Sequence, residues 1–126
     1  LNKKIRNKKI TFLGVTFKAN TDDMRDSSSL KLIPWLSKKG ALINYFDPTG
    51  YKKEFSKLKN VTYKTTIKEA ILGSDLVIIH TEWNDFKSIN FKNLVKGKKF
   101  IIFDMRNIYS SSKITGQGFR YFSVGK

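Results

Sequence analysis

A polar, charged segment lies between a predicted strand and a predicted helix, at residues 17–27. It carries two cations, Lys18 and Arg25, whose side chains suit the phosphate groups of a ligand. Residues 9–15, just before it, are apolar, β-branched or aromatic for the most part, which predicts a buried strand. Ligands of open α/β sheets bind beyond the carboxyl ends of the strands. The sequence therefore predicts a binding loop for a phosphorylated ligand here.

Two further motifs follow apolar runs in the same way, namely His-Thr-Glu-Trp at residues 80–83 and Asp-Met-Arg-Asn-Ile-Tyr at residues 104–109. Together with residues 17–27, which fit the pattern F-K-x-N-T-D-D-x-R-x-S, they resemble the C-terminal, UDP-binding domain of the UDP-glucose/GDP-mannose dehydrogenase family. The resemblance runs from about Lys9 to Lys126, nearly the whole chain. Three spaced motifs in one order form a far more specific signal than any one of them.

The resemblance implies roles for four residues. The backbone and ring of Phe17 would border the nucleotide, and Lys18 and Arg106 would contact the substrate. Arg25 would lie on the NAD side of the cleft. Arg106 directly follows a predicted strand, where a planar guanidinium suits a phosphate or a nucleotide ring better than lysine does.

Each of these residues also has an ordinary structural interpretation. Lys18 could be a solvated loop lysine, and Phe17 could simply cover the edge of the sheet. Arg106 could pair with Asp104, and Arg25 could pair with a carboxylate of its own loop, at Asp22, Asp23 or Asp26. Exposed ion pairs of this kind contribute only about 0 to 1 kcal/mol. The residues alone leave both interpretations open, and the resemblance favours ligand contact.

The implied chemistry is the oxidation of UDP-glucose to UDP-glucuronate by two NAD molecules, through a covalent intermediate on a cysteine. This chain has no cysteine, and a single glycine, Gly14, stands where a dinucleotide-binding turn needs three. We therefore expect residues 9–126 to be a C-terminal domain that positions the nucleotide diphosphate, with residues 1–8 as a linker from an upstream region. It would hold no catalytic residue and be inactive alone, while NAD would be bound mainly by the missing N-terminal domain of a cytoplasmic homodimer.

Two rival functions remain. A dehydrogenase acting on GDP-mannose or on a UDP-N-acetylhexosamine would share the fold, although the pairing of Asn-Thr-Asp-Asp with Thr-Glu-Trp resembles the UDP-glucose branch more closely. A nucleic-acid-binding module is favoured only by the net charge of +15. That charge comes from 21 Lys and only 4 Arg spread along the chain, which indicates a solvated surface. No apolar run is long enough to suggest a membrane span.

The remaining polar candidates have less support. His80 is the single histidine and invites a general-base role, but no serine or cysteine motif adjoins it and the resemblance assigns it none. We therefore expect a structural role for it. Asp22, Asp23 and Asp104 could in principle bind a hard cation, but turn and capping roles are more typical, so we expect no metal site.

Strand and helix signals alternate along the 126 residues, which predicts one Rossmann-like α/β domain of three layers with a mostly parallel sheet of about six strands. A helix should start after Asp26 or Ser27 and run to Lys39, with Pro34 kinking it or delaying its start. The predicted strands are residues 9–15, 41–46, 61–63, 75–80, 99–104 and 119–124. The other predicted helices are residues 52–58, residues 67–72 with Thr66 and Glu69 as a capping box, and a short one within residues 86–94.

Overall fold

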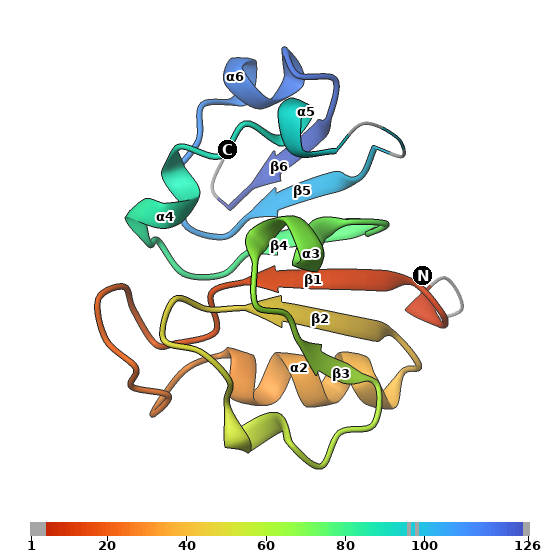
Figure 1. The fold of residues 1–126 in the computed structure, drawn as a ribbon, viewed down its shortest axis with the longest axis vertical. Helices are drawn as coiled ribbons and strands as arrows, with labels where there is room; N and C mark the ends of the chain where they lie inside the picture. Colours follow the sequence, from red (N-terminus) through yellow and green to blue (C-terminus); the bar gives the residue numbers. More distant parts are fainter. Residues whose placement is uncertain (1–4, 96, 98, 125–126) are drawn as a thin grey trace.

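The computed structural model describes residues 5–95, 97 and 99–124. Six parallel strands form one sheet in the order β3-β2-β1-β4-β5-β6 (Figure 1). This is the strand order of the doubly wound Rossmann fold, with its topological switch point between β1 and β4. The strands are β1 (Lys9–Leu13), β2 (Leu42–Phe46), β3 (Val61–Tyr63), β4 (Leu76–Ile79), β5 (Ile101–Asp104) and β6 (Arg120–Ser123). The predicted parallel sheet is confirmed, including β6 at its edge.

Helices cover both faces of the sheet and complete the three layers. They are α2 (Ser29–Lys38), η1 (Lys53–Phe55), α3 (Ile67–Ile71), α4 (Asn84–Lys87), α5 (Phe91–Leu94) and α6 (Ser111–Thr115). Alternate residues of each strand point to opposite faces. Phe12 accordingly packs in one core cluster with Ile33 of α2, while Leu13 packs in the other with residues of α3, α4, α5 and α6. Apolar burial on both faces is what holds a parallel sheet together.

The capping box predicted at residues 66–69 is confirmed. Thr66 caps α3 by accepting a hydrogen bond from the backbone N–H of Glu69, at 3.1 Å. The Thr66 hydroxyl also donates to the Glu69 carboxylate, at 3.2 Å. The Asp47–Gly50 turn after β2 closes with a hydrogen bond from Gly50 N–H to the Asp47 carbonyl, at 2.9 Å.

Other helix boundaries differ from the prediction. The N-cap of α2 is Ser28 rather than Asp26 or Ser27, and α2 continues through Pro34 to Lys38. A proline removes one backbone hydrogen bond, but burial of Ile33 and Leu36 on either side holds the helix. The predicted helix at 52–58 shrinks to the single turn η1, and the short helices α4 and α6 were not predicted. Pieces of four or five residues carry too little hydrophobic periodicity to stand out.

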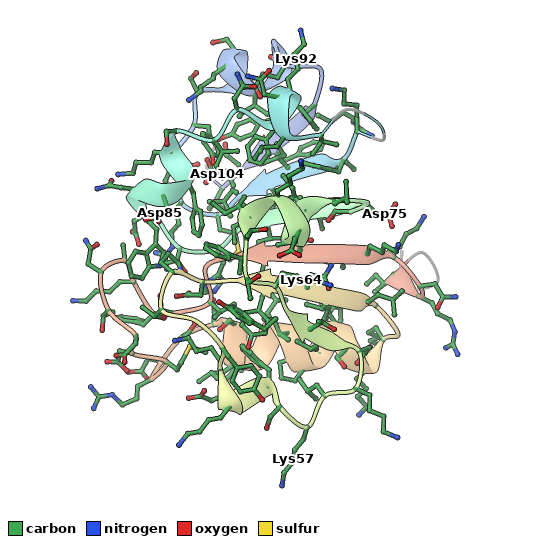
Figure 2. The ribbon with its side chains drawn as sticks, in the orientation of Figure 1. Lys57, Lys64, Asp75, Asp85, Lys92 and Asp104 are labelled. Carbon is green, nitrogen blue, oxygen red and sulfur yellow. The ribbon has the colours of Figure 1, made fainter. Side chains whose placement is uncertain are left out.

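The lysines are dispersed over the molecule, as their spread in the sequence suggests. Figure 2 shows Lys57 and Lys92 projecting from opposite ends, whereas Asp104 lies inside the fold. Of the helices in the described part of the chain, none is both long and apolar enough to cross a membrane.

Candidate functional site

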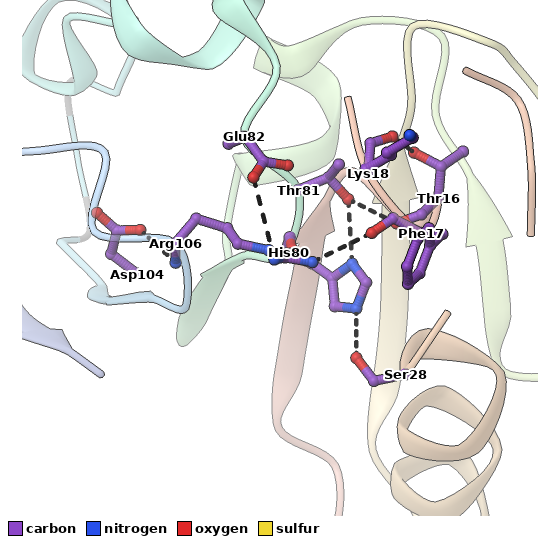
Figure 3. A network of polar contacts seen from close by, with 9 residues as sticks. All are labelled: Thr16, Phe17, Lys18, Ser28, His80, Thr81, Glu82, Asp104 and Arg106. Atoms are coloured by element: carbon purple, nitrogen blue, oxygen red, sulfur yellow. Dashed lines mark hydrogen bonds and ion pairs between the residues drawn. The ribbon is translucent and has the colours of Figure 1, made fainter. Parts of the chain in front are cut away.

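Three polar loops meet at the switch point of the sheet, beyond the carboxyl ends of β1, β4 and β5. The strand register places Leu13 beside Ile79 and Ile79 beside Asp104, so the chain leaves all three strands at the same edge. The loop after β1 carries Phe17 and Lys18, and the loop after β5 carries Arg106 (Figure 3). Phe17, Lys18 and Arg106 are therefore carried by loops at the edge where open α/β sheets bind ligands.

Arg106 connects these loops through its guanidinium group. Its Nε donates to the backbone carbonyl of His80 at 2.9 Å, and its Nη2 donates to the carbonyl of Phe17 at 3.2 Å (Figure 3). Its Nη1 lies 4.0 Å from a carboxylate oxygen of Glu82. The expected alternative, an ion pair with Asp104, is not what the structure shows, because Asp104 accepts from the backbone N–H of Arg106 instead.

Asp104 fixes the loop that carries Arg106. Its buried carboxylate accepts hydrogen bonds from the backbone N–H groups of Arg106 and Tyr109, both at 3.0 Å, and from the Tyr121 hydroxyl at 2.8 Å. Burial, and then the neighbouring Asp104, raise the pKa of Tyr121 to about 12, so it remains a donor at neutral pH. The guanidinium of Arg106 is thus held on a rigid loop.

Phe17 and Lys18 are exposed on the loop after β1. The Phe17 ring is 44% exposed, and its backbone N–H donates to the Asp23 carbonyl at 3.0 Å. The Thr16 hydroxyl donates to the Lys18 carbonyl at 2.9 Å. The loop backbone is held by these bonds, while both side chains are exposed and the Phe17 carbonyl contacts Arg106.

Arg25 lies on the far part of the same loop and pairs with Asp23. Its Nε donates to one carboxylate oxygen of Asp23 and its Nη2 donates to the other, both at 3.0 Å, and its side chain is 89% exposed. The hydrogen bond from Arg25 lowers the pKa of Asp23. Arg25 is therefore paired with Asp23 in a position open to solvent.

His80 is buried beneath this site. Its Nε2 lies 2.8 Å from the hydroxyl of Ser28, and its Nδ1 lies 3.1 Å from that of Thr81 (Figure 3). Burial, and then the positive charge of Arg106, lower the pKa of His80 to about 4. A serine does adjoin the histidine, 52 positions away in the chain. An imidazole of such low basicity is a weak general base near neutral pH, which favours a structural role for the pair.

The two positions with which a Rossmann fold binds a dinucleotide already have partners within this domain. Gly14 has a φ of 81°, and a Cβ there would lie 2.6 Å from Cβ of Thr81. Asp47, at the end of β2, is the position whose carboxylate would bind a ribose. It is buried and accepts from the backbone N–H groups of Val15 and Thr49, at 2.8 and 2.9 Å. These residues do not fit NAD bound in the usual Rossmann manner.

Sequence reasoning missed Ser28, Thr16 and Asp47 as residues that build the site. Asp47 could have been found, because an acidic residue after the second strand is a known feature of Rossmann sequences. Nothing local distinguishes Ser28 or Thr16, whose partners are distant in sequence. Within the described ranges, no three His, Asp or Glu side chains are grouped to hold a metal ion.

The surroundings of Glu82 offer additional polar atoms. Its Oε1 and the indole Nε1 of Trp83 are buried and have no hydrogen-bond partner within the described part of the chain. Trp83 is itself 8% exposed and belongs to the core. By contrast, a cavity of about 500 Å³ lies at the opposite end of the strands, lined by apolar residues such as Ile10, Leu76 and Phe100. It is separate from the polar site.

Comparison with known proteins connects this site to a family. Residues 11–111 match the model of the "UDP-glucose/GDP-mannose dehydrogenase family, UDP binding domain". UDP-glucose 6-dehydrogenase of Rhizobium meliloti is 37% identical over 123 residues, which are 97% of this chain and 28% of that protein. UDP-glucose 6-dehydrogenase YwqF of Bacillus subtilis is 37% identical over 126 residues, again 97% of this chain and 28% of the relative. The chain thus spans little more than a quarter of the length of these relatives.

Solved structures agree in fold. A UDP-glucose dehydrogenase from Pyrobaculum islandicum superposes with a TM-score of 0.71 at 26% identity, over 86% of this chain and 24% of that one. An NDP-N-acetyl-D-galactosaminuronic acid dehydrogenase from Methanosarcina mazei superposes with a TM-score of 0.81 at 23% identity, over 98% and 26%.

Proposed function

This chain belongs to the UDP-glucose/GDP-mannose dehydrogenase family, where it matches the UDP-binding domain, and we propose that it binds the UDP part of UDP-glucose within an NAD-dependent UDP-glucose 6-dehydrogenase. The observation that carries this proposal is the convergence of Phe17, Lys18 and Arg106 at the switch point of the sheet. An aromatic ring, an ammonium and a guanidinium carried by loops at one edge of the sheet suit a nucleotide diphosphate. Identity of 37% to UDP-glucose 6-dehydrogenases supports glucose as the sugar.

The residues would divide the work by their chemistry. Two N–H groups of Arg106 hold backbone carbonyls, and its remaining donors would bind a phosphate or the nucleotide ring. Lys18, on the exposed loop, would act as a point charge on the diphosphate. The Phe17 ring would cover the nucleotide. Gripping the diphosphate fixes the sugar at a distance, so the binding energy made here orients the reacting alcohol for chemistry performed elsewhere.

That chemistry would belong to the remainder of a longer enzyme. When bound there, NAD would accept hydride from the sugar, and a cysteine, which this chain lacks, would form the covalent intermediate. Residues 9–126 would be the UDP-binding domain, with residues 1–8 leading into it, and the whole enzyme would be a cytoplasmic homodimer. The exposed side chain of Arg25 would face the NAD side of the cleft. In the complete enzyme, Arg25→Ala should therefore weaken the binding of NAD more than the binding of UDP-glucose.

Calorimetric titration of the chain with UDP tests the proposal. We expect UDP to bind and GDP to bind more weakly. Lys18→Ala and Arg106→Ala should each raise the dissociation constant of UDP by roughly tenfold, as for loss of a charge-assisted hydrogen bond. Lys57→Ala, which removes an equal charge far from the site, is the control (Figure 2). Unchanged UDP affinity in both Lys18→Ala and Arg106→Ala would overturn the assignment. A preference for GDP would favour a GDP-mannose enzyme, and steeply salt-dependent binding of DNA without UDP binding would favour the nucleic-acid module.

A further inference from the structure

The side chain of His80 joins two segments that the proposed ligand site needs. Its Nε2 contacts the hydroxyl of Ser28, at the N-cap of α2, at 2.8 Å. Its Nδ1 contacts the hydroxyl of Thr81 at 3.1 Å, and that hydroxyl donates to the carbonyl of Thr16, also at 3.1 Å. His80 therefore lies between the start of α2 and the loop that carries Phe17 and Lys18 (Figure 3).

These contacts determine where the imidazole carries its proton. A threonine hydroxyl has one hydrogen, and that of Thr81 is directed to the Thr16 carbonyl. The contact between Thr81 and His80 is therefore a hydrogen bond donated by Nδ1. In the neutral ring Nε2 is then an acceptor, and the Ser28 hydroxyl donates to it. The order of donors runs without conflict from Ser28 to His80, to Thr81 and to Thr16.

The backbone of His80 extends this network to Arg106. Its N–H donates to the Leu13 carbonyl at 3.0 Å, which keeps β4 beside β1. Its carbonyl accepts from Nε of Arg106, and Nη2 of Arg106 donates to the carbonyl of Phe17. Since Thr16 and Phe17 are neighbours, the contacts close a ring that contains Arg106 and the loop bearing Lys18.

We propose that His80 is a positioning residue for binding of the nucleotide diphosphate. Its ring is the neutral imidazole protonated on Nδ1, and it fixes the position of residues 16–18 relative to Arg106 and α2. This inference rests on the proposed function for the identity of its ligand, but the tautomer and the loop order do not depend on it. His80 is 1% exposed and its ring lies below the site, so the ring acts through Ser28 and through Thr81 to Thr16 rather than by touching the ligand.

The first experiment reads the tautomer directly. Long-range ¹H–¹⁵N correlation spectra of the uniformly labelled, tag-free chain contain one histidine, so the ring nitrogens need no further assignment. At pH 7 we expect a protonated Nδ1 and an acceptor Nε2, the reverse of the form favoured by free histidine. A ring protonated on Nε2 in the wild-type chain would overturn the proposal.

The second experiment tests positioning with variants that leave the imidazole in place. Thr81→Val and Ser28→Ala should each raise the dissociation constant of UDP by roughly 3- to 10-fold, the worth of a hydrogen bond. Their combination should raise it by less than the product of the two, because they act through one ring. Thr81→Ser, which retains the hydroxyl, should restore the affinity. Thr62→Val, the same kind of change at an exposed position of β3, is the control.

Amide hydrogen exchange separates this inference from the proposed function. In Thr81→Val the Phe17 amide should exchange faster than in the wild type and in Thr62→Val, whether or not UDP binds. Failure of the wild-type chain to bind UDP would sink the proposed function alone. Exchange at Phe17 that matches the wild type in both Thr81→Val and Ser28→Ala, with thermal unfolding showing folded variants, would refute a positioning role for His80.

Discussion

Arg106 uses two of its N–H groups on backbone carbonyls, which distinguishes it from an arginine that merely adds positive charge to a site. Because the guanidinium is planar and rigid, binding of the His80 and Phe17 carbonyls fixes the direction of its remaining donors. Lys18 is exposed on the loop after β1, and its ammonium is a point charge on a flexible stem. The two cations should therefore respond differently to exchange of one basic residue for another.

Exchange of the basic residues tests this difference. Arg106→Lys keeps the charge but cannot hold both carbonyls with one ammonium, so UDP binding should weaken by roughly 1 to 3 kcal/mol. Lys18→Arg should be milder, because Lys18 acts chiefly as a point charge. Arg120→Lys, on the edge strand β6, is the matched control and should leave UDP affinity unchanged. Isothermal calorimetry gives the UDP affinity of all three variants. Equal affinities for Arg106→Lys and Arg120→Lys would contradict the role assigned to the two carbonyl contacts of Arg106.

His80 should make the stability of the domain depend on pH in a defined window. Its pKa is about 4 in the folded protein against an ordinary 6.5, because burial and Arg106 disfavour the imidazolium. Between these values the unfolded chain binds a proton that the folded protein does not. The free energy of unfolding should therefore fall as the pH drops from 6.5 to 4, by about 3 kcal/mol from this group.

Urea unfolding at several pH values measures this dependence. Carboxylates also titrate in the range, so His80→Gln, which cannot be protonated, is the reference. The wild type should lose more stability than His80→Gln between pH 6.5 and 4, and parallel curves would show that His80 is not the group responsible.

At the scale of elements, the end of β1 is specified by close packing against the segment after β4. Gly14 combines a positive φ with a near contact to Thr81, whereas Gly50 has a φ of 93° and nothing within 4 Å of a Cβ placed there. Gly14→Ala should cost roughly 2 to 4 kcal/mol of unfolding free energy, from backbone strain and overpacking together. Gly50→Ala should cost only the strain, about 1 to 2 kcal/mol. Equal losses in chemical denaturation would mean that the Thr81 contact is relieved at little cost.

The capping box of α3 provides a second test at this scale. Thr66 accepts from the Glu69 N–H, whereas the adjacent Thr65 bonds only to the Glu69 carboxylate, at 3.0 Å. Thr66→Ala should therefore lower the unfolding free energy by about 1 kcal/mol. Thr65→Ala should change it by less, and a reversed order in thermal unfolding would contradict the assigned cap.

For the whole molecule, we expect binding without turnover. The chain contains no cysteine. Where a Rossmann fold would hold a dinucleotide, the turn at Gly14 packs against Thr81 and the carboxylate of Asp47 accepts a hydrogen bond from the backbone of Val15. Mixing the pure chain with UDP-glucose and NAD should give no increase in NADH absorbance above a protein-free control. Measurable turnover would contradict the division of labour proposed for the longer enzyme.

The sequence was informative wherever a signal is local or periodic. Apolar runs identified the central strands, including Ile101–Asp104, because buried parallel strands are nearly continuous in hydrophobicity. The box of Thr66 and Glu69 identified α3 because capping needs only residues three apart. The start of α2 was wrong by a residue or two, since three successive serines offer similar caps. Short α4 and α6 fell below what periodicity can detect.

The candidate site was likewise predicted from the sequence only in part. The order of motifs after strands was enough to bring Lys18 and Arg106 to one edge of the sheet, because parallel strands all end on the same side. The hydrogen-bond partners of His80 and Arg106, which support the site, could not be predicted from the sequence. Ser28 and His80 are 52 residues apart, and Arg106 and Phe17 are 89 apart. Hydrogen bonds over such separations depend on how the helices and strands pack, so only the tertiary structure decided that His80 lies beneath the site and that Arg106 binds two carbonyls.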